Sequence, residues 1–459
     1  MSHDLVVTGG TVVSPDQGRY RADVGADDGM ISAIEAPGTL DGETVVDATS
    51  KHVFPGVFDP HTHHGISRSL AADTESETQS DLVGGVTTTA NFFRRPGSYL
   101  AIMDEYLDAV EEAAHHDVVF SLGLLSFEHV EEIPAIVEDL GITSFKWYMV
   151  YKHRAREVFG VDCDMRDDFA DAMLEQLAAL DAETTLGFHS ENVEITRPRG
   201  ESREASGADG YEALVEAFPG YAEAQSLAGA ATLACHHGYD GSFYAVHISS
   251  ARTVETVRDL HGAGYGLTGE TCPHYLTLTT EECDDLMKIN PPIRGQADQD
   301  ALWAALADGT IDCVGADHCV KPMPGKLGDT VWESENAFPG SALILPLLLS
   351  EGYHEDWLSL ERVAAVTSQN NAQAWNLYPK KGTIRVGADA DLAVVDLDET
   401  KTVTPELLQG AADYCVYDGR EVTGWPTHTV ARGRLAFAEG DVLADPGDGE
   451  NVRFPVSVD

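Results

Sequence analysis

Two histidines follow an apolar segment near the amino end of the chain. Residues 53–59 read Val-Phe-Pro-Gly-Val-Phe-Asp and lead into Pro-His-Thr-His, which places histidines at positions 61 and 63. Side chains two residues apart in an extended chain point to the same side, so His61 and His63 can bind one metal ion together. The pair alone is a weak signal, because the chain has 18 histidines and such pairs are more often loop or core features.

Four other segments with the character of buried strands carry side chains of matching chemistry. These residues, each within or at the end of its segment, are Lys146, His189, His247 and Asp317. Each alone is most simply a hydrogen-bonded core residue. Lys146 stands out because an ammonium is costly to bury. The simpler interpretation of this lysine is that its aliphatic side chain is buried and its ammonium reaches out to a carboxylate. Together with the first two histidines, the set predicts a metal-dependent active site at strand ends.

Strands and helices alternate through the middle of the chain. The eight expected strands are residues 53–59, 87–91, 118–125, 144–147, 185–189, 244–247, 266–270 and 313–317. Apolar residues recur at helical spacing in residues 165–180, 221–233 and 301–306. Eight such units predict an α/β fold of the (β/α)8 TIM-barrel type, whose active sites lie at the C-terminal ends of the strands. A doubly wound open sheet is the alternative, but the chain has no glycine-rich phosphate-binding motif.

Both ends of the chain read as short strands separated by turns, with Gly9-Gly10 as one of the turns. Residues 1–52 and 380–443 are therefore expected to pair into a small β-sandwich domain, and residues 53–379 to form the barrel. Residues 444–459 are expected to be a C-terminal tail, either mobile or exchanged with another copy.

Charge and cysteine content narrow the classes of function. The 459 residues include 77 Asp plus Glu against 29 Lys plus Arg, a formal net charge of −48, which argues against nucleic acid or an anionic membrane as a partner. Lysines are scarce and acidic residues are spread along the chain, which favours a halophilic protein from a high-salt cytoplasm over an ordinary acidic enzyme. The 7 cysteines form no CxxC pair, and the amino end has neither a basic segment nor a long apolar stretch, so we expect no signal peptide. We therefore expect a cytoplasmic protein without disulfides.

Sequence motifs along almost the whole chain are similar to those of one enzyme superfamily. They are Leu5-Val-Val-Thr-Gly-Gly-Thr-Val-Val, Asp59-Pro-His-Thr-His, Gly85-Val-Thr-Thr-Thr, Ser144-Phe-Lys-Trp-Tyr-Met-Val-Tyr, Glu270-Thr-Cys-Pro-His-Tyr-Leu and Asn290-Pro-Pro-Ile-Arg. The chain resembles the amidohydrolase superfamily and, within it, the cyclic amidases. These are the dihydropyrimidinases and D-hydantoinases, with allantoinases and dihydroorotases as relatives.

The resemblance implies a binuclear centre of two divalent metal ions, usually zinc. The implied ligands are His61, His63 and Asp317 for one metal, and His189 and His247 for the other. Lys146, carboxylated by carbon dioxide to N6-carboxylysine, would bridge the two. A carbamate suits this role because its two oxygens can bind two cations, which also removes the cost of burying its charge.

The implied reaction is hydrolysis of a cyclic amide, the ring opening of a dihydropyrimidine or a hydantoin. Hydroxide between the two metals would attack the ring carbonyl, and Asp317 would pass its proton to the leaving nitrogen. Tyr151 would donate a hydrogen bond to the developing oxyanion. The simpler interpretation of Tyr151 is a tyrosine in a surface loop with no role in the reaction.

Substrate contacts are implied at Asn290 and Asn336. Asn290 stands where hydantoinase-like relatives often have serine and dihydroorotases often have asparagine, whereas Gly65 stands where dihydroorotases generally carry an arginine. An allantoinase or dihydroorotase-type activity is the alternative, and a metal-free scaffold relative is the non-enzyme alternative. The resemblance also implies a homo-oligomer, either a tetramer or a dimer. It further implies that the protein binds a small-molecule cyclic amide as its substrate.

Overall fold

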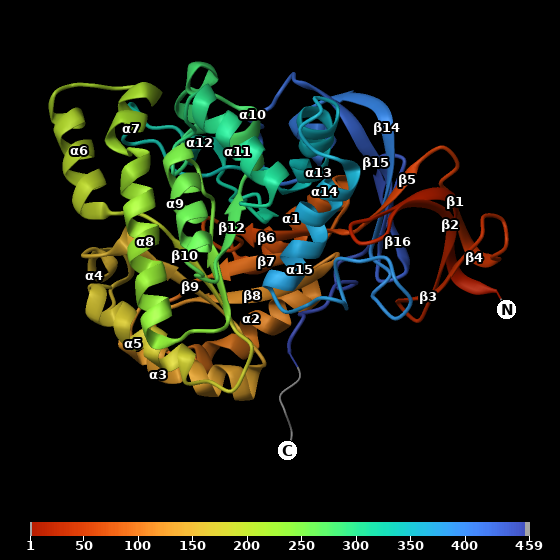
Figure 1. Ribbon diagram of the computed structural model, residues 1–459, viewed down its shortest axis with the longest axis horizontal. Coiled ribbons are helices and arrows are strands. Elements are labelled where there is room, and N and C mark those ends of the chain that lie inside the picture. The colour runs from red at the N-terminus through yellow and green to blue at the C-terminus, as the bar shows by residue number, and fades with distance from the viewer. Residues whose placement is uncertain (1, 455–459) are drawn as a thin grey trace.

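The computed structural model describes residues 2–454, and its larger domain is a barrel of eight parallel strands (Figure 1). The strands are β6 (Val57–Thr62), β7 (Val86–Phe93), β8 (Asp117–Gly123), β9 (Ser144–Tyr148), β10 (Thr185–His189), β11 (Ser242–Ala245), β12 (Thr268–Thr271) and β13 (Cys313–Val314). Nearly all their residues are buried, because helices cover the outside and side chains fill the inside. The expected TIM barrel is confirmed.

Backbone hydrogen bonds join the first and last strands of the barrel just beyond the end of β13. The amide of His318 donates to the carbonyl of His61 at 3.0 Å, and the amide of His63 donates to the carbonyl of His318 at 2.8 Å. The chain around residues 61–63 therefore lies beside the chain around residue 318, although the two are far apart in sequence.

The single strand expected at residues 53–59 is two strands. β5 (His52–Pro55) pairs with strands of the second sheet, and β6 begins the barrel. Gly56 separates them, and a Cβ at this position would lie 2.2 Å from Oγ1 of Thr87. The chain thus changes sheets at a residue that packs too closely against β7 to carry a side chain.

Helices cover the outside of the barrel (Figure 1). The longer ones are α1 (Leu70–Val83), α2 (Tyr99–Ala113), α3 (Phe127–Ala135), α5 (Asp167–Ala178), α6 (Val193–Ala205), α7 (Tyr211–Ala217), α8 (Gly220–His237), α9 (Ala251–Gly262) and α11 (Gln296–Asp308). The shorter ones are α4 (Ala155–Phe159), α10 (Pro273–Thr277), α12 (Met323–Lys326), α13 (Ile344–Leu347), α14 (Leu360–Ala364), α15 (Asn370–Ala374) and α16 (Pro405–Leu408). The helical stretches expected at residues 165–180, 221–233 and 301–306 correspond to α5, α8 and α11. In α5, apolar residues at helical spacing are buried, and two aspartates in the first turn face the positive end of the helix dipole.

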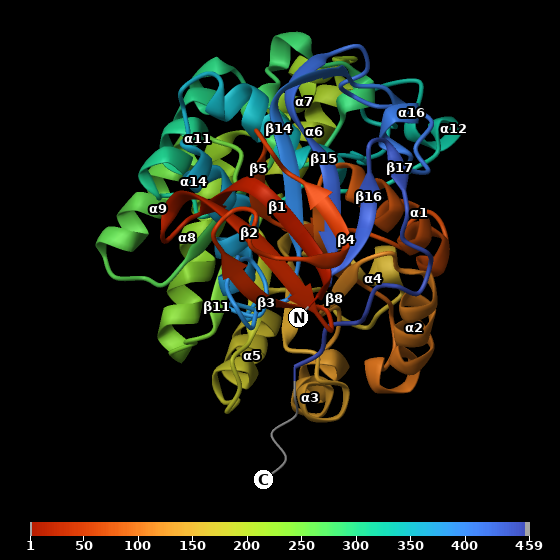
Figure 2. The ribbon, with the colours of Figure 1, turned by 90° about the vertical axis from the view of Figure 1, so that its right-hand side faces the viewer.

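The two chain ends form the second sheet, which has nine strands (Figure 2). The remaining strands are β1 (His3–Ser14), β2 (Gly18–Asp27), β3 (Met30–Glu35), β4 (Gly42–Asp47), β14 (Leu392–Thr402), β15 (Glu421–Ala431), β16 (Arg434–Ala438) and β17 (Asp441–Val442). The amino-terminal and carboxyl-terminal strands meet where β5 pairs with β14, so the expected small β domain from both termini is confirmed. Gly9-Gly10 is not a turn: β1 continues through it with a shift in register, because Gly9 adopts a φ of +73° that makes a bulge.

The described part of the C-terminal segment lies along the barrel of its own chain. The amides of Gly447 and Gly449 donate to the carbonyl of Ala114 at 3.0 and 2.9 Å, and the amide of Val118 donates to the carbonyl of Glu450 at 2.9 Å. Of the segment expected to be a tail, residues 444–454 are therefore docked, and residues 455–459 lie outside the described residues.

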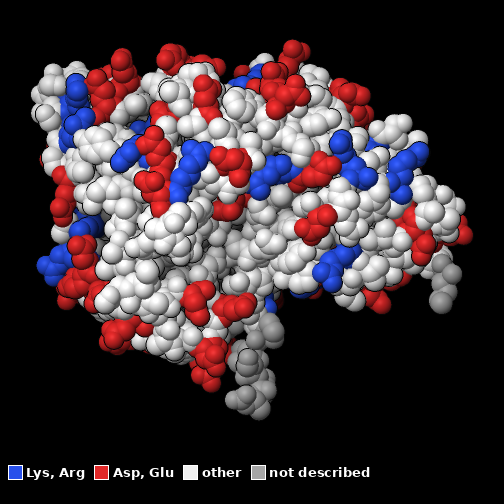
Figure 3. All heavy atoms as spheres, viewed as in Figure 1, with Lys and Arg blue, Asp and Glu red and all other residues white. Residues whose placement is uncertain are grey.

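Acidic side chains are spread over the face seen in Figure 3, with basic side chains between them. This distribution agrees with the absence of an acidic block in the sequence. None of the helices in residues 2–454 has the length and apolar character that a membrane span requires.

A buried lysine connects the barrel to the β domain. Lys381 is 2% exposed, and its Nζ lies 2.8 Å from Asp117 at the start of β8, 2.7 Å from Asp391 and 3.0 Å from Asp389, both just before β14. The burial of the ammonium is balanced by three carboxylates. Removing it would leave Asp391 with no ion pair within residues 2–454, and Asp117 and Asp389 with one each, to Arg432 and Lys380.

We expect Lys381→Met to lower the free energy of unfolding by about 3–5 kcal/mol, because it breaks a buried ion cluster from one side. The matched control is Lys152→Met, since the carboxylates that pair with Lys152, Asp167 and Glu194, are 84% and 64% exposed. The control should cost no more than about 1 kcal/mol. Denaturant unfolding of both variants at one KCl concentration tests this expectation, and equal midpoints for the two would contradict it.

Candidate active site

A cavity of about 340 Å³ opens at the C-terminal ends of the barrel strands. It contains every residue that the sequence suggests for the site: His61, His63, Lys146, Tyr151, His189, His247, Asn290, Asp317 and Asn336. The volume lies within the range of small-molecule sites. Strand ends position most of these side chains, since His61, Lys146 and His189 lie in β6, β9 and β10. His247 and Asp317 follow β11 and β13 closely.

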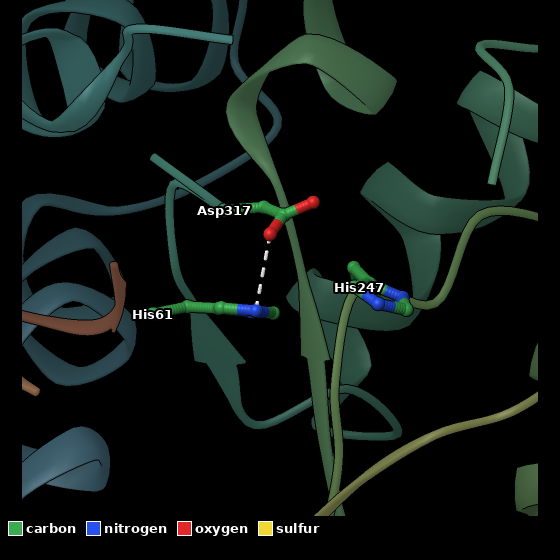
Figure 4. A group of neighbouring side chains, drawn as sticks. All are labelled: His61, His247 and Asp317. Carbon is green, nitrogen blue, oxygen red and sulfur yellow. Dashed lines mark ion pairs between the residues drawn. The ribbon is translucent and has the colours of Figure 1, made fainter. Parts of the chain in front are cut away.

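Asp317 lies close to His61 and His247 (Figure 4). One oxygen, Oδ1, is 3.1 Å from Nε2 of His61 and 3.1 Å from Nε2 of His63. Potential ligand atoms of His61, His247 and Asp317 all lie within 4.8 Å of one another. The ring of His189 packs edge-on against that of His247, with centroids 4.5 Å apart. The closure of the barrel between β6 and the end of β13 brings Asp317 to His61 and His63.

Two of these residues have strained backbones. His247 has a φ of +43° and Asp317 a φ of +51°, in the left-handed region that residues other than glycine rarely adopt. Such strain persists only where the surrounding structure enforces it, and it concentrates at functional sites. The strain therefore marks these two strand ends as parts of the site.

Burial controls the protonation of the site. Burial lowers the pKa of His63 to about 3, so its ring is neutral and keeps a lone pair. Burial would raise the pKa of Asp317, but His61 and His63 hold it well below its usual value. Burial also lowers the pKa of Lys146 to about 7, so much of the amine is neutral near that pH.

Lys146 has an unusual environment for a lysine. It is 1% exposed, and its Nζ finds no hydrogen-bond partner within residues 2–454. Its Nζ lies 4.0 Å from the centroid of the Phe92 ring. Imidazoles, an ionised carboxylate and an amine without a partner among the described residues together fit divalent metal ions, which bind nitrogen and oxygen ligands of these kinds.

Comparison with known proteins agrees with this chemistry. Residues 52–436 match the model of the Amidohydrolase family. The chain belongs to this family. An L-hydantoinase from Paenarthrobacter aurescens is 29% identical over 98% of this chain and 98% of that protein, and a D-hydantoinase from Geobacillus stearothermophilus is 30% identical over 98% and 96%. The crystal structure of a dihydropyrimidinase from Brevibacillus agri NCHU1002 matches with a TM-score of 0.88 at 28% identity, over 98% of both chains. The expected superfamily and the expectation of a hydrolytic enzyme are confirmed.

Glu270 is a part of this amidohydrolase site to which the sequence assigned no role. Its Oε1 accepts hydrogen bonds from Nδ1 of His61 at 2.8 Å and from the amide of His247 at 2.9 Å, and it is fully buried. Burial would lower the pKa of His61, but Glu270 and Asp317 outweigh it and raise that pKa. A proton on Nδ1 leaves Nε2 directed at Asp317 as a ligand atom, which is how carboxylates orient metal-binding histidines.

The two asparagines of the amidohydrolase cavity differ in their surroundings. Nδ2 of Asn290 donates to Oε2 of Glu191 at 2.8 Å, and Oε2 also lies 3.3 Å from Nε2 of His189. Asn336 is exposed at the mouth of the cavity. Asn290 is thus connected to the predicted metal ligands through Glu191, a contact that no sequence spacing indicates.

Two lysines hold together the segments that carry these asparagines. The Nζ of Lys326, which is fully buried, donates to the carbonyls of Lys288 at 2.9 Å and Glu335 at 2.6 Å. The Nζ of Lys288 donates in return to the carbonyls of Trp332 at 3.0 Å and Ser334 at 2.5 Å. Because Asn290 follows Lys288 by two residues and Asn336 follows Glu335 directly, this double clamp sets the spacing of the two asparagines. The scarcity of lysine in the sequence could have drawn attention to Lys288 and Lys326, but the sequence analysis assigned them no role.

We expect Lys326→Met to lower kcat/KM of this amidohydrolase roughly 10- to 100-fold while its metal content stays the same, because small displacements of substrate-positioning groups cost rates of this order. Lys321→Met is the control, since Lys321 pairs with the side chain of Glu335 at 3.1 Å without contacting the backbone clamp. Steady-state kinetics, with melting curves to verify folding, test the expectation. A folded Lys326→Met enzyme with unchanged kcat/KM would refute the clamp's role.

Proposed function

We propose that the protein hydrolyses a cyclic amide, opening a dihydropyrimidine or hydantoin ring. The observation that carries this proposal is the convergence of four histidines, Lys146 and Asp317 in one cavity. That cavity lies in a chain that hydantoinases match over almost its full length.

The metal centre belongs to this proposal. One ion would be held by His61, His63 and Asp317, the other by His189 and His247, and Lys146 would bridge them as a carbamate formed with carbon dioxide. Bound divalent ions, with zinc the expected metal, supply a nucleophile at neutral pH and polarise the amide carbonyl. The buried, partly neutral amine of Lys146 supports the carbamate, since only a neutral amine reacts with carbon dioxide.

The chain's own groups would move the proton and hold the ring. Asp317, ionised because its pKa is held low, would accept a proton and deliver it to the leaving ring nitrogen. Tyr151 lines the same cavity and would donate its phenol hydrogen to the developing oxyanion. The segments at Asn290 and Asn336, spaced by the lysine clamp, would bind the ring.

A substrate series tests the activity. We expect the zinc-loaded protein to open hydantoin or dihydrouracil, and we include allantoin and dihydroorotate to cover the alternatives. The assays are run in concentrated KCl, because the acidic surface supports a protein adapted to a high-salt cytoplasm. Turnover of allantoin alone or dihydroorotate alone would favour that alternative, and no turnover of any of the four would reject the proposal.

Removal of Lys146 tests the metal centre. We expect Lys146→Ala to abolish ring opening and to lower the bound metal from about two ions to less than one per chain, because the bridging group is lost. Lys152→Ala is the control, since Lys152 forms an ion pair with Asp167 at 2.8 Å and does not contact the predicted metal ligands. Elemental analysis and activity are measured on the same preparations. Full activity in Lys146→Ala would refute the carbamate, and less than one metal ion in the unaltered protein would favour the scaffold alternative.

A further inference from the structure

One arginine of the cavity has no anionic partner. Arg94 follows β7 directly, is half-buried, and lines the same cavity as His63 and Lys146. Within residues 2–454, no carboxylate forms an ion pair with it, and its one side-chain hydrogen bond is a long contact of 3.5 Å from Nη1 to the hydroxyl of Tyr148. A guanidinium has five N–H donors, so most of them are left for a molecule in the cavity.

Other arginines near the cavity are engaged elsewhere. Nη1 of Arg68 lies 3.3 Å from Asp73, and the guanidinium of Arg95 donates to the carbonyls of Gly65 at 2.8 Å and Arg94 at 2.9 Å. Arg154, at the cavity wall, pairs with Glu157 at 3.4 Å. The chain has 77 acidic residues, so a shortage of carboxylates does not explain why Arg94 has none.

Aromatic rings hold the Arg94 guanidinium in place without neutralising it. Its Cζ lies 5.2 Å from the ring centre of Tyr148 and 5.9 Å from that of Tyr151. Gly123, the last residue of β8, makes this packing possible, because a Cβ there would lie 2.8 Å from Cε2 of Tyr148 and 3.0 Å from Cβ of Arg94. A guanidinium fixed in this way is suited to bind a planar carboxylate through two parallel hydrogen bonds.

We propose that the substrate carries a carboxylate beside its amide ring and that Arg94 binds this carboxylate. This inference rests on the proposed ring-opening function. The carboxylates that line the cavity are engaged by other residues: Asp317 contacts His61 and His63 at 3.1 Å, and Glu335 pairs with Lys321 at 3.1 Å. An added carboxylate therefore meets Arg94 as an unmatched cation.

The charge of the whole chain makes this local cation necessary. A net charge of −48 repels an anion at long range, whereas salt screens that repulsion and leaves the short contact with Arg94. Arg94 is accordingly a specificity-determining residue, which discriminates anionic from neutral rings of the same size.

A pair of substrates that differ only in charge tests the inference. Hydantoin-5-acetate and hydantoin-5-acetamide have the same ring and nearly the same shape, and both are assayed with the metal-loaded enzyme in concentrated KCl. We expect the unaltered enzyme to prefer the acetate, and Arg94→Gln to reduce the acetate-to-acetamide ratio of kcat/KM on the order of 10- to 100-fold, the usual worth of a charged hydrogen bond. Arg94→Lys should keep part of the preference because it keeps the charge. Arg68→Gln should leave the ratio unchanged, since Arg68 pairs with Asp73 and does not line the cavity.

Equal losses for both compounds in Arg94→Gln would overturn the inference, because Arg94 would then only position Tyr148 and Tyr151. An unaltered enzyme without preference for the acetate would overturn it as well. Calorimetric binding of the same two compounds separates this inference from the proposed function. Tighter binding of the acetate that Arg94→Gln abolishes would support carboxylate recognition even if neither ring is opened, and equal binding would reject it.

Discussion

The closure of the barrel between β6 and the end of β13 is the constraint on which the site depends. The backbone of His318 bonds to that of His61 and His63, so the residue just before it, Asp317, comes within 3.1 Å of both imidazoles. These hydrogen bonds belong to the fold as much as to the site. The positive φ of Asp317 is held by the same junction, and the barrel supplies the stability that keeps this strained conformation populated.

Three buried lysines show how differently this acidic chain treats a buried cation. Lys381 is surrounded by three carboxylates, and Lys326 is bound by backbone carbonyls. Lys146 has neither, and its amine faces an aromatic ring and a group of histidines. The carboxylates around Lys381 raise its pKa and stabilise an ammonium, whereas burial lowers the pKa of both Lys326 and Lys146 to about 7. Lys146 is the chemically available one because it lines the cavity and its amine has no hydrogen-bond partner within residues 2–454.

The strand ends were largely predictable because barrel strands are short, buried and apolar, and their polar exceptions are conspicuous. His61, His189 and Asp317 all stood out in this way. The incorrect predictions of local structure arose where a short sequence is compatible with two different backbone structures. Gly9-Gly10 suits a turn or a bulge, and only the pairing of β1 with β2 selects the bulge. Residues 53–59 read as one strand, and only the tight packing of Gly56 against Thr87 divides them between two sheets.

By itself, the sequence determined the class of chemistry, since residue types and their spacing limit which ligands and which strands can form. It also determined the α/β barrel and the joining of the chain ends, because hydrophobic periodicity is local information. Only the tertiary structure decided which polar groups have partners. Glu270 behind His61, the clamp of Lys326 and Lys288, and the unmatched guanidinium of Arg94 all depend on residues distant in sequence. The physical reason is that burial and electrostatic balance are sums over spatial neighbours, which the order of residues along a chain does not specify.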